Sequence, residues 1–256
     1  MNSPLHALIT GATSGIGLSL ARSFLQEGYR VSVCSRSAKT KSHLFAPQLK
    51  ANNVQLIDMD ATLRPDVESA FKEAKAGFGS VSVLINNAGQ ALSETFEKST
   101  AELLTNLMST NLMSVFNCSQ VALMDMKSNH FGRIINIAST AGLIGYAYTS
   151  AYCASKHAVI GLSKSLALEL AKSGITVNCI CPGFTDTPLA EHAIKNIATK
   201  TQMSLEDAKK SLTKLNPMGR MINPEEIAHT ALWLASKGAA SINGQAVCVS
   251  GGEVMN

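Results

Sequence analysis

Short apolar runs alternate with longer amphipathic stretches along the whole chain, and this alternation constrains the fold more than any other feature. Several of the short runs are apolar at nearly every position, as in strands that are covered on both faces. The longer stretches have the residue spacing of helices with one apolar face. This pattern predicts right-handed strand–helix–strand units and therefore a doubly wound parallel sheet with helices on both faces.

Seven of the short runs have the length and composition of strands. They are His6–Thr10, Arg30–Ser35, Val54–Met59, Val81–Ile85, Arg133–Ala138, Ile175–Cys181 and Gln245–Val249. Four of the intervening stretches have clear helical patterns, and they are Ile16–Glu27, Pro65–Ala76, Ala101–Met126 and Ser150–Lys172. We therefore expect an α/β fold in which about seven parallel strands are flanked by helices.

A chain of this length can bury one large core. No repeat, low-complexity tract or linker marks a second domain, so we expect residues 1–256 to form a single domain. The longest departure from the alternation lies between Thr187 and Asn223. Its helical pattern follows one of the last predicted strands, which predicts a helical lid over a substrate pocket at about residues 187–223.

The composition argues against several classes of protein. The formal net charge is only +4, and no run of five or more basic residues offers a surface for nucleic acid or for a membrane. We expect no signal peptide and no membrane-spanning helix, and hence a cytoplasmic protein. The six cysteines are scattered, with only Cys179 and Cys181 close together, so we expect reduced thiols and no metal site.

A glycine-rich turn follows the first predicted strand and leads into the first predicted helix. From Thr10 its sequence reads TGATSGIG. Glycines at such a turn allow a sharp bend, close approach of the backbone to a pyrophosphate, and tight packing of helix on strand. The helix N-terminus offers unpaired N–H groups to an anion. A glycine cluster alone could be an ordinary turn, but its place in a strand–helix–strand series predicts a dinucleotide site.

The end of the second predicted strand bears on the choice of cofactor. Sites for NAD usually carry an acidic residue there, about 20 positions beyond the glycines, to hold the ribose 2′-hydroxyl. This chain has Ser35 followed by Arg36. A hydroxyl and a guanidinium bind a 2′-phosphate, which a carboxylate would repel. The sequence therefore favours NADP(H), and NAD(H) remains the alternative if Arg36 is only a solvated loop residue.

A tyrosine and a lysine lie four residues apart on one predicted helix, at Tyr152 and Lys156. This spacing places them on the same helix face, where an ammonium favours the phenolate form of a tyrosine. The pair could therefore transfer a proton, although the same spacing is common on ordinary helix surfaces. Ser139 ends the preceding strand, and Asn86-Asn87-Ala88-Gly89 ends the strand before it, where parallel sheets gather ligands.

These motifs together resemble those of the short-chain dehydrogenase/reductase family. In chain order they are the glycine turn, Asn86-Asn87-Ala88-Gly89, Asn111, Ser139, Tyr152 with Lys156, and Pro182-Gly183 followed by Thr187. Each motif is weak alone, but the complete ordered set is highly specific and spans the chain from Leu5 to about Gly252. The resemblance implies a Rossmann-like fold and an NAD(P)-dependent oxidoreductase that acts on CH–OH groups.

The resemblance also implies roles for four catalytic residues. Tyr152 would be the general acid in reduction, and Ser139 would steady the carbonyl or alcohol oxygen. Lys156 would lower the pKa of Tyr152 and hold the nicotinamide ribose. Asn111 would anchor a water that relays protons to Lys156.

Cofactor contacts follow from the same resemblance. Asp60 and Ala61 would lie at the adenine, and Thr187 near the nicotinamide carboxamide. The full set of expected cofactor-binding residues is Gly11, Ser14, Gly15, Ile16, Gly17, Ser35, Arg36, Asp60, Ala61, Asn87, Ala88, Gly89, Tyr152, Lys156, Pro182, Gly183, Thr185 and Thr187.

The segment from Ile137 to Pro188 is most similar to 3-oxoacyl reductases of the fatty-acid and polyketide type. The chain lacks the arginines with which many of these enzymes dock a carrier protein. It also has Ala141 and Thr149 where 3-hydroxybutyrate dehydrogenases have a His and a Lys. The expected substrate pocket is largely apolar and is lined by Ser139, Ala141, Leu143, Ile144, Tyr152, Phe184 and Leu189.

We therefore expect NADP(H)-dependent reduction of a carbonyl to a secondary alcohol, on a small-molecule or thioester substrate. A 3-oxoacyl thioester or a similar hydrophobic ketone fits the apolar pocket. The alternative is an NAD(P)-dependent dehydrogenase of a cyclic, aryl or steroid alcohol. A non-catalytic dinucleotide sensor is the remote alternative, because Tyr152 and Lys156 are both retained. Apolar surface on the predicted helices Ala101–Met126 and Ser150–Lys172 predicts a homotetramer.

Overall fold

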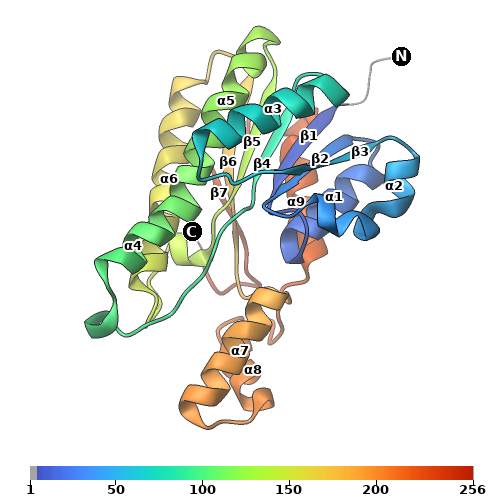
Figure 1. The fold of residues 1–256 in the computed structure, drawn as a ribbon. Coiled ribbons are helices and arrows are strands. Elements are labelled where there is room, and N and C mark those ends of the chain that lie inside the picture. Colours follow the sequence, from blue (N-terminus) through green and yellow to red (C-terminus); the bar gives the residue numbers. More distant parts are fainter. Residues whose placement is uncertain (1–4, 256) are drawn as a thin grey trace.

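Seven parallel strands form one sheet at the centre of the molecule (Figure 1). The computed structural model describes residues 5–255. The strands are β1 (His6–Thr10), β2 (Arg30–Ser35), β3 (Val54–Asp58), β4 (Val83–Asn86), β5 (Gly132–Ile137), β6 (Ile175–Pro182) and β7 (Ala246–Val249). Their order is β3-β2-β1-β4-β5-β6-β7, so the direction of winding reverses between β1 and β4. The predicted doubly wound, Rossmann-like α/β fold is confirmed.

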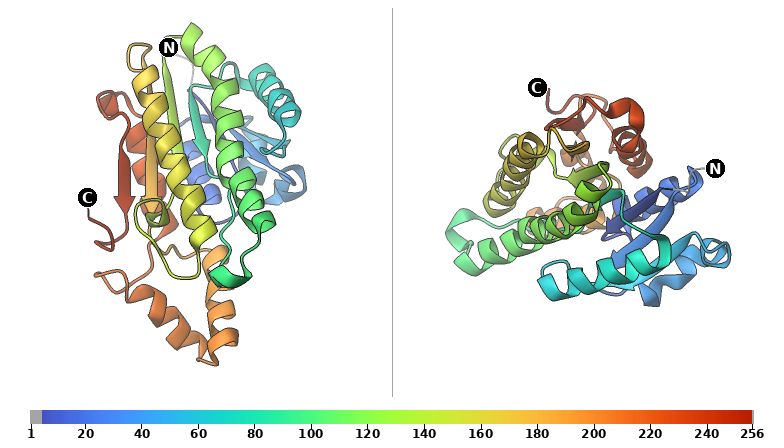
Figure 2. Two further views of the ribbon diagram at one scale, coloured as in Figure 1. Left: turned by 90° about the vertical axis from the view of Figure 1, so that its left-hand side faces the viewer. Right: turned by 90° about the horizontal axis from the view of Figure 1, so that it is seen from above.

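Helices cover both faces of this sheet. Helices α1 and α9 pack together on one face, and α3, α5 and α6 cover the other (Figure 2). The helices are α1 (Gly15–Gln26), α2 (Ala46–Lys50), α3 (Arg64–Phe78), α4 (Ala101–Met108), α5 (Ser114–Ser128), α6 (Ser150–Glu169), α7 (Pro188–Thr201), α8 (Leu205–Thr213) and α9 (Pro224–Ala235). Apolar cores therefore form on both sides of the sheet.

Successive residues of one strand enter opposite cores. In β1, Ala7 and Ile9 pack on the side of α1 and α9, whereas Leu8 packs on the side of α3 and α5. All three are fully buried. Burial of a large aliphatic side chain contributes about 1.5–3 kcal/mol. Because both faces are covered, the strands are apolar at nearly every position and show no polar–apolar alternation.

Two predicted helices differ from the structure in detail. The stretch Ala101–Met126 is interrupted by a π-helical turn at Ser109–Met113, which divides it into α4 and α5. Such a turn holds an extra residue, which apolar spacing does not reveal, and it turns Asn111 into the buried interior. The stretch Ser150–Lys172 ends as a helix at Glu169. Strand ends shift by one or two residues, as boundaries commonly do.

Helices α7 and α8 project from the carboxyl end of the sheet, apart from the two helical layers (Figure 1). They lie within the segment predicted as a lid, 187–223. Among residues 5–255, no helix combines the length and the apolar character that crossing a bilayer requires.

A buried histidine fastens the amino-terminal end of the sheet. His6 Nδ1 lies 2.8 Å from Gly79 O, and His6 Nε2 lies 2.7 Å from Ser32 Oγ. Gln55 Nε2 also donates to Ser32 Oγ at 2.6 Å. Because the Gly79 carbonyl can only accept, Nδ1 carries the proton when the ring is neutral, and Nε2 then accepts from the Ser32 hydroxyl. Burial lowers the pKa of His6 below its ordinary value of 6.5, although the hydrogen bond to Gly79 opposes this shift.

The lowered pKa predicts acid sensitivity of the fold. The neutral imidazole stabilises the folded state fully above its unfolded pKa near 6.5, and this contribution is lost as the pH falls toward the lower folded value. His6→Phe should lower the free energy of unfolding at pH 7.5 by about 1–3 kcal/mol, because a buried side chain loses both of its hydrogen bonds. It should also flatten the decline of stability between pH 7.5 and pH 5.5. Urea unfolding at both pH values measures this, with His229→Phe on the surface as the matched control.

Candidate active site

The glycine turn between β1 and α1 packs directly on the segment that follows β4. Asn87 Nδ2 donates to Thr10 O at 3.0 Å and to Gly11 O at 3.1 Å. In return, Thr10 Oγ1 accepts hydrogen bonds from the backbone N–H groups of Asn87 and Ala88, both at 3.0 Å. Two motifs separated by more than 70 residues are thus held together at the switch point of the sheet.

Two glycines of the turn could not be replaced without displacing the backbone. Gly11 has a φ of +64°, which favours glycine, and a Cβ there would lie 3.0 Å from Ala88 Cα. A Cβ at Gly17 would lie 2.2 Å from Gly11 O. Ser14 is the N-cap of α1, but its side chain makes no capping hydrogen bond. The first N–H groups of α1, at Gly15 and after it, are therefore available to an anion.

The ends of β2 and β3 lie side by side next to this turn. Thr13 Oγ1 is 3.5 Å from Ser35 Oγ, and Arg36 follows as an exposed residue. Asp60 accepts hydrogen bonds from Thr62 Oγ1 at 2.7 Å and Thr62 N at 2.9 Å. These bonds, the hydroxyl first, lower the pKa of Asp60, and the nearby Arg36 guanidinium adds to the effect. Ser35, Arg36 and Asp60 therefore lie at one edge of the sheet, and their contact with the adenosine end of a cofactor stays a prediction.

The four predicted catalytic residues converge at the carboxyl end of β4, β5 and β6. Ser139 follows β5, and its Oγ accepts a hydrogen bond from Ala141 N at 3.1 Å. Lys156 is buried, and its Nζ donates to Ile137 O at 2.9 Å and lies 5.9 Å from the centre of the Tyr152 ring. The three side chains Ser139, Tyr152 and Lys156 therefore come from neighbouring elements that face one another.

Asn111 is held in place by residues that the sequence did not single out. Its Oδ1 accepts from Gln90 N at 2.8 Å, and its Nδ2 donates to Gln90 O at 3.0 Å and to Ser155 Oγ at 2.9 Å. Gly89 leaves room for this contact, since a Cβ there would lie 2.9 Å from Asn111 Oδ1. Ser155 adjoins Lys156 in the sequence, and this adjacency is the only sequence feature that could have indicated its contact with Asn111.

Burial controls both acid–base groups of the site. Burial raises the pKa of Tyr152 above its ordinary value of 10, while a hydrogen bond with Ser139 opposes the shift. Burial lowers the pKa of Lys156 to about 8. Loss of solvent dominates the pKa of Tyr152 in this structure, and the expected lowering by Lys156 stays a prediction. Tyr152 is protonated near neutral pH, which is the state that a proton donor requires.

The predicted pocket residues lie on three segments around this centre. Ala141 is buried, Leu143 and Phe184 are half-buried, and Ile144 and Leu189 are exposed. The ring of Tyr146, which was not predicted, packs edge-on against Phe184 with a centroid separation of 6.0 Å. Tyr146 thus connects the loop after β5, which carries Ala141 and Leu143, with the segment after β6, which carries Phe184.

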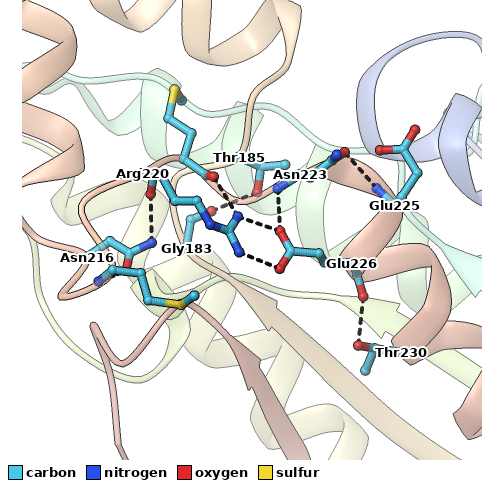
Figure 3. Close-up of polar contacts among 10 residues, drawn as sticks. Gly183, Thr185, Asn216, Arg220, Asn223, Glu225, Glu226 and Thr230 are labelled. Carbon is cyan, nitrogen blue, oxygen red and sulfur yellow. Dashed lines mark hydrogen bonds and ion pairs between the residues drawn. The ribbon is translucent and has the colours of Figure 1, made fainter.

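The two connections of α7 and α8 to the sheet are bonded to each other. A β-bridge joins Thr185 with Ile222, through Ile222 N donating to Phe184 O at 2.9 Å and Asp186 N donating to Ile222 O at 2.9 Å. Next to it, Thr185 Oγ1 donates to Gly183 O at 2.9 Å (Figure 3). Thr187 then caps the N-terminus of α7. Thr185 and Thr187 are therefore fixed beside Gly183, at the end of β6.

An ion pair secures the base of the same unit, and sequence reasoning missed it. Arg220 donates to both carboxylate oxygens of Glu226, at 2.7 and 2.8 Å (Figure 3). Glu226 also accepts from Asn223 N at 2.8 Å, which completes a capping box at the start of α9. The Arg220 hydrogen bond, followed by that of Asn223, lowers the pKa of Glu226 to about 2. The return from α8 to the sheet is therefore held at a defined position.

The sequence model of the short-chain dehydrogenases matches residues 5–198. The chain belongs to the short-chain dehydrogenase family. This match covers the glycine turn and all four residues of the predicted catalytic group.

Similar proteins in this family match almost the whole chain. A variant of actinorhodin polyketide ketoreductase, crystallised with NADPH, is 37% identical with a TM-score of 0.93, and the match covers 98% of this chain and 97% of that one. A 3-oxoacyl-(acyl-carrier-protein) reductase of Staphylococcus aureus is 36% identical over 97% of this chain and 98% of its own. A D-beta-hydroxybutyrate dehydrogenase of Cupriavidus necator is 35% identical over 97% of each chain.

The packing at Gly17 generates a prediction about dinucleotide binding. The methyl group of Gly17→Ala would lie 2.2 Å from Gly11 O and 2.5 Å from Asn87 Nδ2, so the turn must shift away from Asn87. We expect the dissociation constant for NADPH, measured by fluorescence titration, to rise at least about tenfold, since one lost hydrogen bond to an anion already costs about 1.5–3 kcal/mol. The matched control is Gly161→Ala, where a Cβ meets no atom within 4 Å. Equal dissociation constants for the two variants would contradict this account.

Proposed function

We propose that this short-chain dehydrogenase reduces a carbonyl to a secondary alcohol with NADPH. The observation that carries the proposal is the convergence of Ser139, Tyr152 and buried Lys156 at the carboxyl end of the sheet. Only β4 separates β5, which Ser139 follows, from β1, which the glycine turn follows. The names of a polyketide ketoreductase and a 3-oxoacyl reductase among its relatives support the same reaction.

Each residue of the proposed catalytic group has a different role in this reaction. The nicotinamide, when bound, supplies the hydride to the carbonyl carbon. The Ser139 hydroxyl donates a hydrogen bond to the carbonyl oxygen, and Tyr152 transfers its phenolic proton to the same oxygen. The raised pKa of Tyr152 keeps that proton in place until charge develops on the oxygen. Lys156, with its pKa lowered to about 8, then stabilises the phenolate and exchanges protons near neutral pH.

The cofactor site is proposed to extend from the ends of β2 and β3 to the end of β6. The adenosine end would be held by Ser35, Arg36, Asp60 and Ala61, with the 2′-phosphate of NADP(H) at Arg36. The glycine turn and the start of α1 would hold the pyrophosphate. The nicotinamide end would be held by Tyr152, Lys156 and the group formed by Asn87, Ala88, Gly89, Pro182, Gly183, Thr185 and Thr187.

The substrate is proposed to be a 3-oxoacyl thioester or a similar hydrophobic ketone. The pocket residues Ala141, Leu143, Phe184 and Leu189 are apolar, and α7 with α8 would form the lid above them. Oxidation of a secondary alcohol is the second candidate, favoured by the likeness to a D-beta-hydroxybutyrate dehydrogenase. The apolar Ala141 offers no charge to a carboxylate, which weighs against a small hydroxy acid.

The assembly is proposed to be a homotetramer built through the layer of α4, α5 and α6. Apolar side chains on this layer are exposed in the single chain, namely Leu104, Met113, Phe116, Met124 and Leu168. Met124 is 73% exposed and Leu168 is 81% exposed. Such side chains on adjacent helices favour two-fold pairing between identical faces, and two pairings of this kind give a closed tetramer.

Removing the phenolic hydroxyl tests the proposed reaction. Tyr152→Phe keeps the ring and its packing but cannot donate a proton, so kcat for NADPH-dependent ketone reduction should fall by about 10²–10⁴. The dissociation constant for NADPH should stay within about twofold, because the Tyr152 ring and every other proposed cofactor contact are kept. Steady-state assays and cofactor titration on the same preparation measure both. A variant that retains wild-type kcat would show that Tyr152 is not the acid.

Arg36 should determine which cofactor is preferred. Arg36→Leu removes a guanidinium that would pair with the 2′-phosphate, and such a charge-assisted bond contributes about 1.5–3 kcal/mol. The dissociation constant for NADPH should therefore rise about 10- to 150-fold, while that for NADH changes little. Parallel titrations with both cofactors decide the point. An equal effect on the two cofactors, or a wild-type preference for NADH, would contradict the proposed 2′-phosphate site.

A further inference from the structure

A glutamate from the C-terminal tail reaches the wall of the proposed substrate pocket. After β7 the chain turns through Gly251 and Gly252, whose φ angles are +62° and +90°. Glu253 N then donates to Ser250 O at 3.2 Å, and Val254 N to Ser250 Oγ at 3.3 Å. The backbone of Glu253 is therefore held by hydrogen bonds from its own N–H group and from that of the next residue.

The tail is also packed tightly against the connection between α8 and α9. A Cβ at Gly251 would lie 2.1 Å from Asn216 Oδ1, and one at Gly252 would lie 3.4 Å from Pro217 Cγ. Asn216 is itself buried and donates to Arg220 O at 2.7 Å. The tail therefore runs in close contact with the base of the lid.

The Glu253 carboxylate has one oxygen bonded and one oxygen buried. Its Oε1 accepts a hydrogen bond from Tyr146 Oη at 2.5 Å. Its Oε2 is shielded from solvent and finds no hydrogen-bond partner within residues 5–255. Gly183 leaves the space for Oε2, since a Cβ at that glycine would lie 2.6 Å away. A carboxylate in this setting is costly, and the short bond to Tyr146 is what compensates for its burial.

Tyr146 connects Glu253 with the elements that carry the proposed catalytic residues. Its Oη lies 2.8 Å from the hydroxyl of Thr140, which directly follows Ser139. Its ring packs edge-on against Phe184. Its backbone carbonyl accepts from Thr149 Oγ1 at 2.9 Å, and Thr149 is the N-cap of α6, the helix of Tyr152 and Lys156. One side chain therefore contacts the neighbour of the catalytic serine and the apolar wall of the pocket.

We propose that Glu253 is a positioning residue for the proposed carbonyl reduction. Its hydrogen bond to Tyr146 holds Thr140 and Phe184 in place, and thereby fixes Ser139 opposite Tyr152 and the adjoining pocket wall. Glu253 does not touch the reacting atoms and acts only through Tyr146. This inference rests on the proposed function, because it concerns the geometry of the same reaction.

The test compares four variants with the wild type in ketone reduction at saturating NADPH, well below the unfolding temperature of each. Tyr146→Phe and Glu253→Leu should each lower kcat about tenfold or more, since small misplacements of a catalytic group have effects of this size. The kcat of the double variant should not fall below that of the less active single variant, because both changes remove the same hydrogen bond between Tyr146 and Glu253. Glu253→Gln keeps an acceptor for Tyr146 and should retain kcat within about threefold of the wild type.

Two controls separate positioning from loss of folded structure. The NADPH dissociation constant should stay within about twofold in every variant, because the glycine turn lies on other strands. Tyr29→Phe removes the same hydroxyl from a tyrosine that packs on Phe24 beneath α1, and kcat should be unchanged. Tyr146→Phe removes only the hydroxyl that bonds Glu253, so this variant still tests the proposal if Glu253→Leu does not fold.

The outcomes distinguish this inference from the proposed function. Values of kcat within twofold of the wild type for Tyr146→Phe, or losses that multiply in the double variant, would overturn the positioning role alone. A wild-type protein that reduces no ketone with NADPH would overturn the proposed function, and the positioning role with it.

Discussion

The contact between Asn87 and the glycine turn is the interaction on which the arrangement of the site depends. The side-chain amide of Asn87 donates hydrogen bonds to the carbonyl oxygens of Thr10 and Gly11. These hydrogen bonds join the ends of β1 and β4, where the winding of the sheet reverses. The turn can approach so closely only because Gly11 and Gly17 lack side chains. This contact places the start of α1 next to Asn87, and Gly89, two residues further along, lies against Asn111 and near Lys156.

Burial then sets the chemistry at the centre. Tyr152 and Lys156 both lose solvent, and this loss moves their pKa values apart, upward for the phenol and down to about 8 for the amine. A protonated tyrosine next to an amine that titrates near neutrality is suited to giving a proton and recovering it. A hydrogen bond between Ser139 and Tyr152 opposes this rise in the pKa of Tyr152.

Much of the fold follows from the sequence, because each strand is buried on both faces and therefore carries a nearly continuous apolar run. The glycine turn and the groups around Ser139 and Tyr152 could also be located, since each directly follows or begins a predicted element. The π-helical turn at Ser109–Met113 could not be predicted, because one extra residue in a turn leaves the apolar pattern of a long helix almost unchanged. The rise of the Tyr152 pKa could not be predicted, because it depends on burial, which sequence spacing does not report.

Contacts between distant segments could not be predicted from the sequence either. Tyr146 and Glu253 are 107 positions apart, and neither belongs to a motif that marks it. The pair of Arg220 with Glu226 is close in sequence, but its bidentate geometry depends on the chain turning between them at Asn223. Such contacts arise from how the loops meet at the carboxyl end of the sheet, and loops carry much of the specificity of a site.

The measurement that tests the central claim most directly is the initial rate of NADPH oxidation with a panel of 3-oxoacyl thioesters and hydrophobic ketones, repeated with NADH. We predict Tyr152-dependent turnover of at least one of these carbonyl compounds, with NADPH preferred over NADH. Failure to oxidise NADPH with any carbonyl substrate, by a folded protein that binds the cofactor, would contradict this prediction.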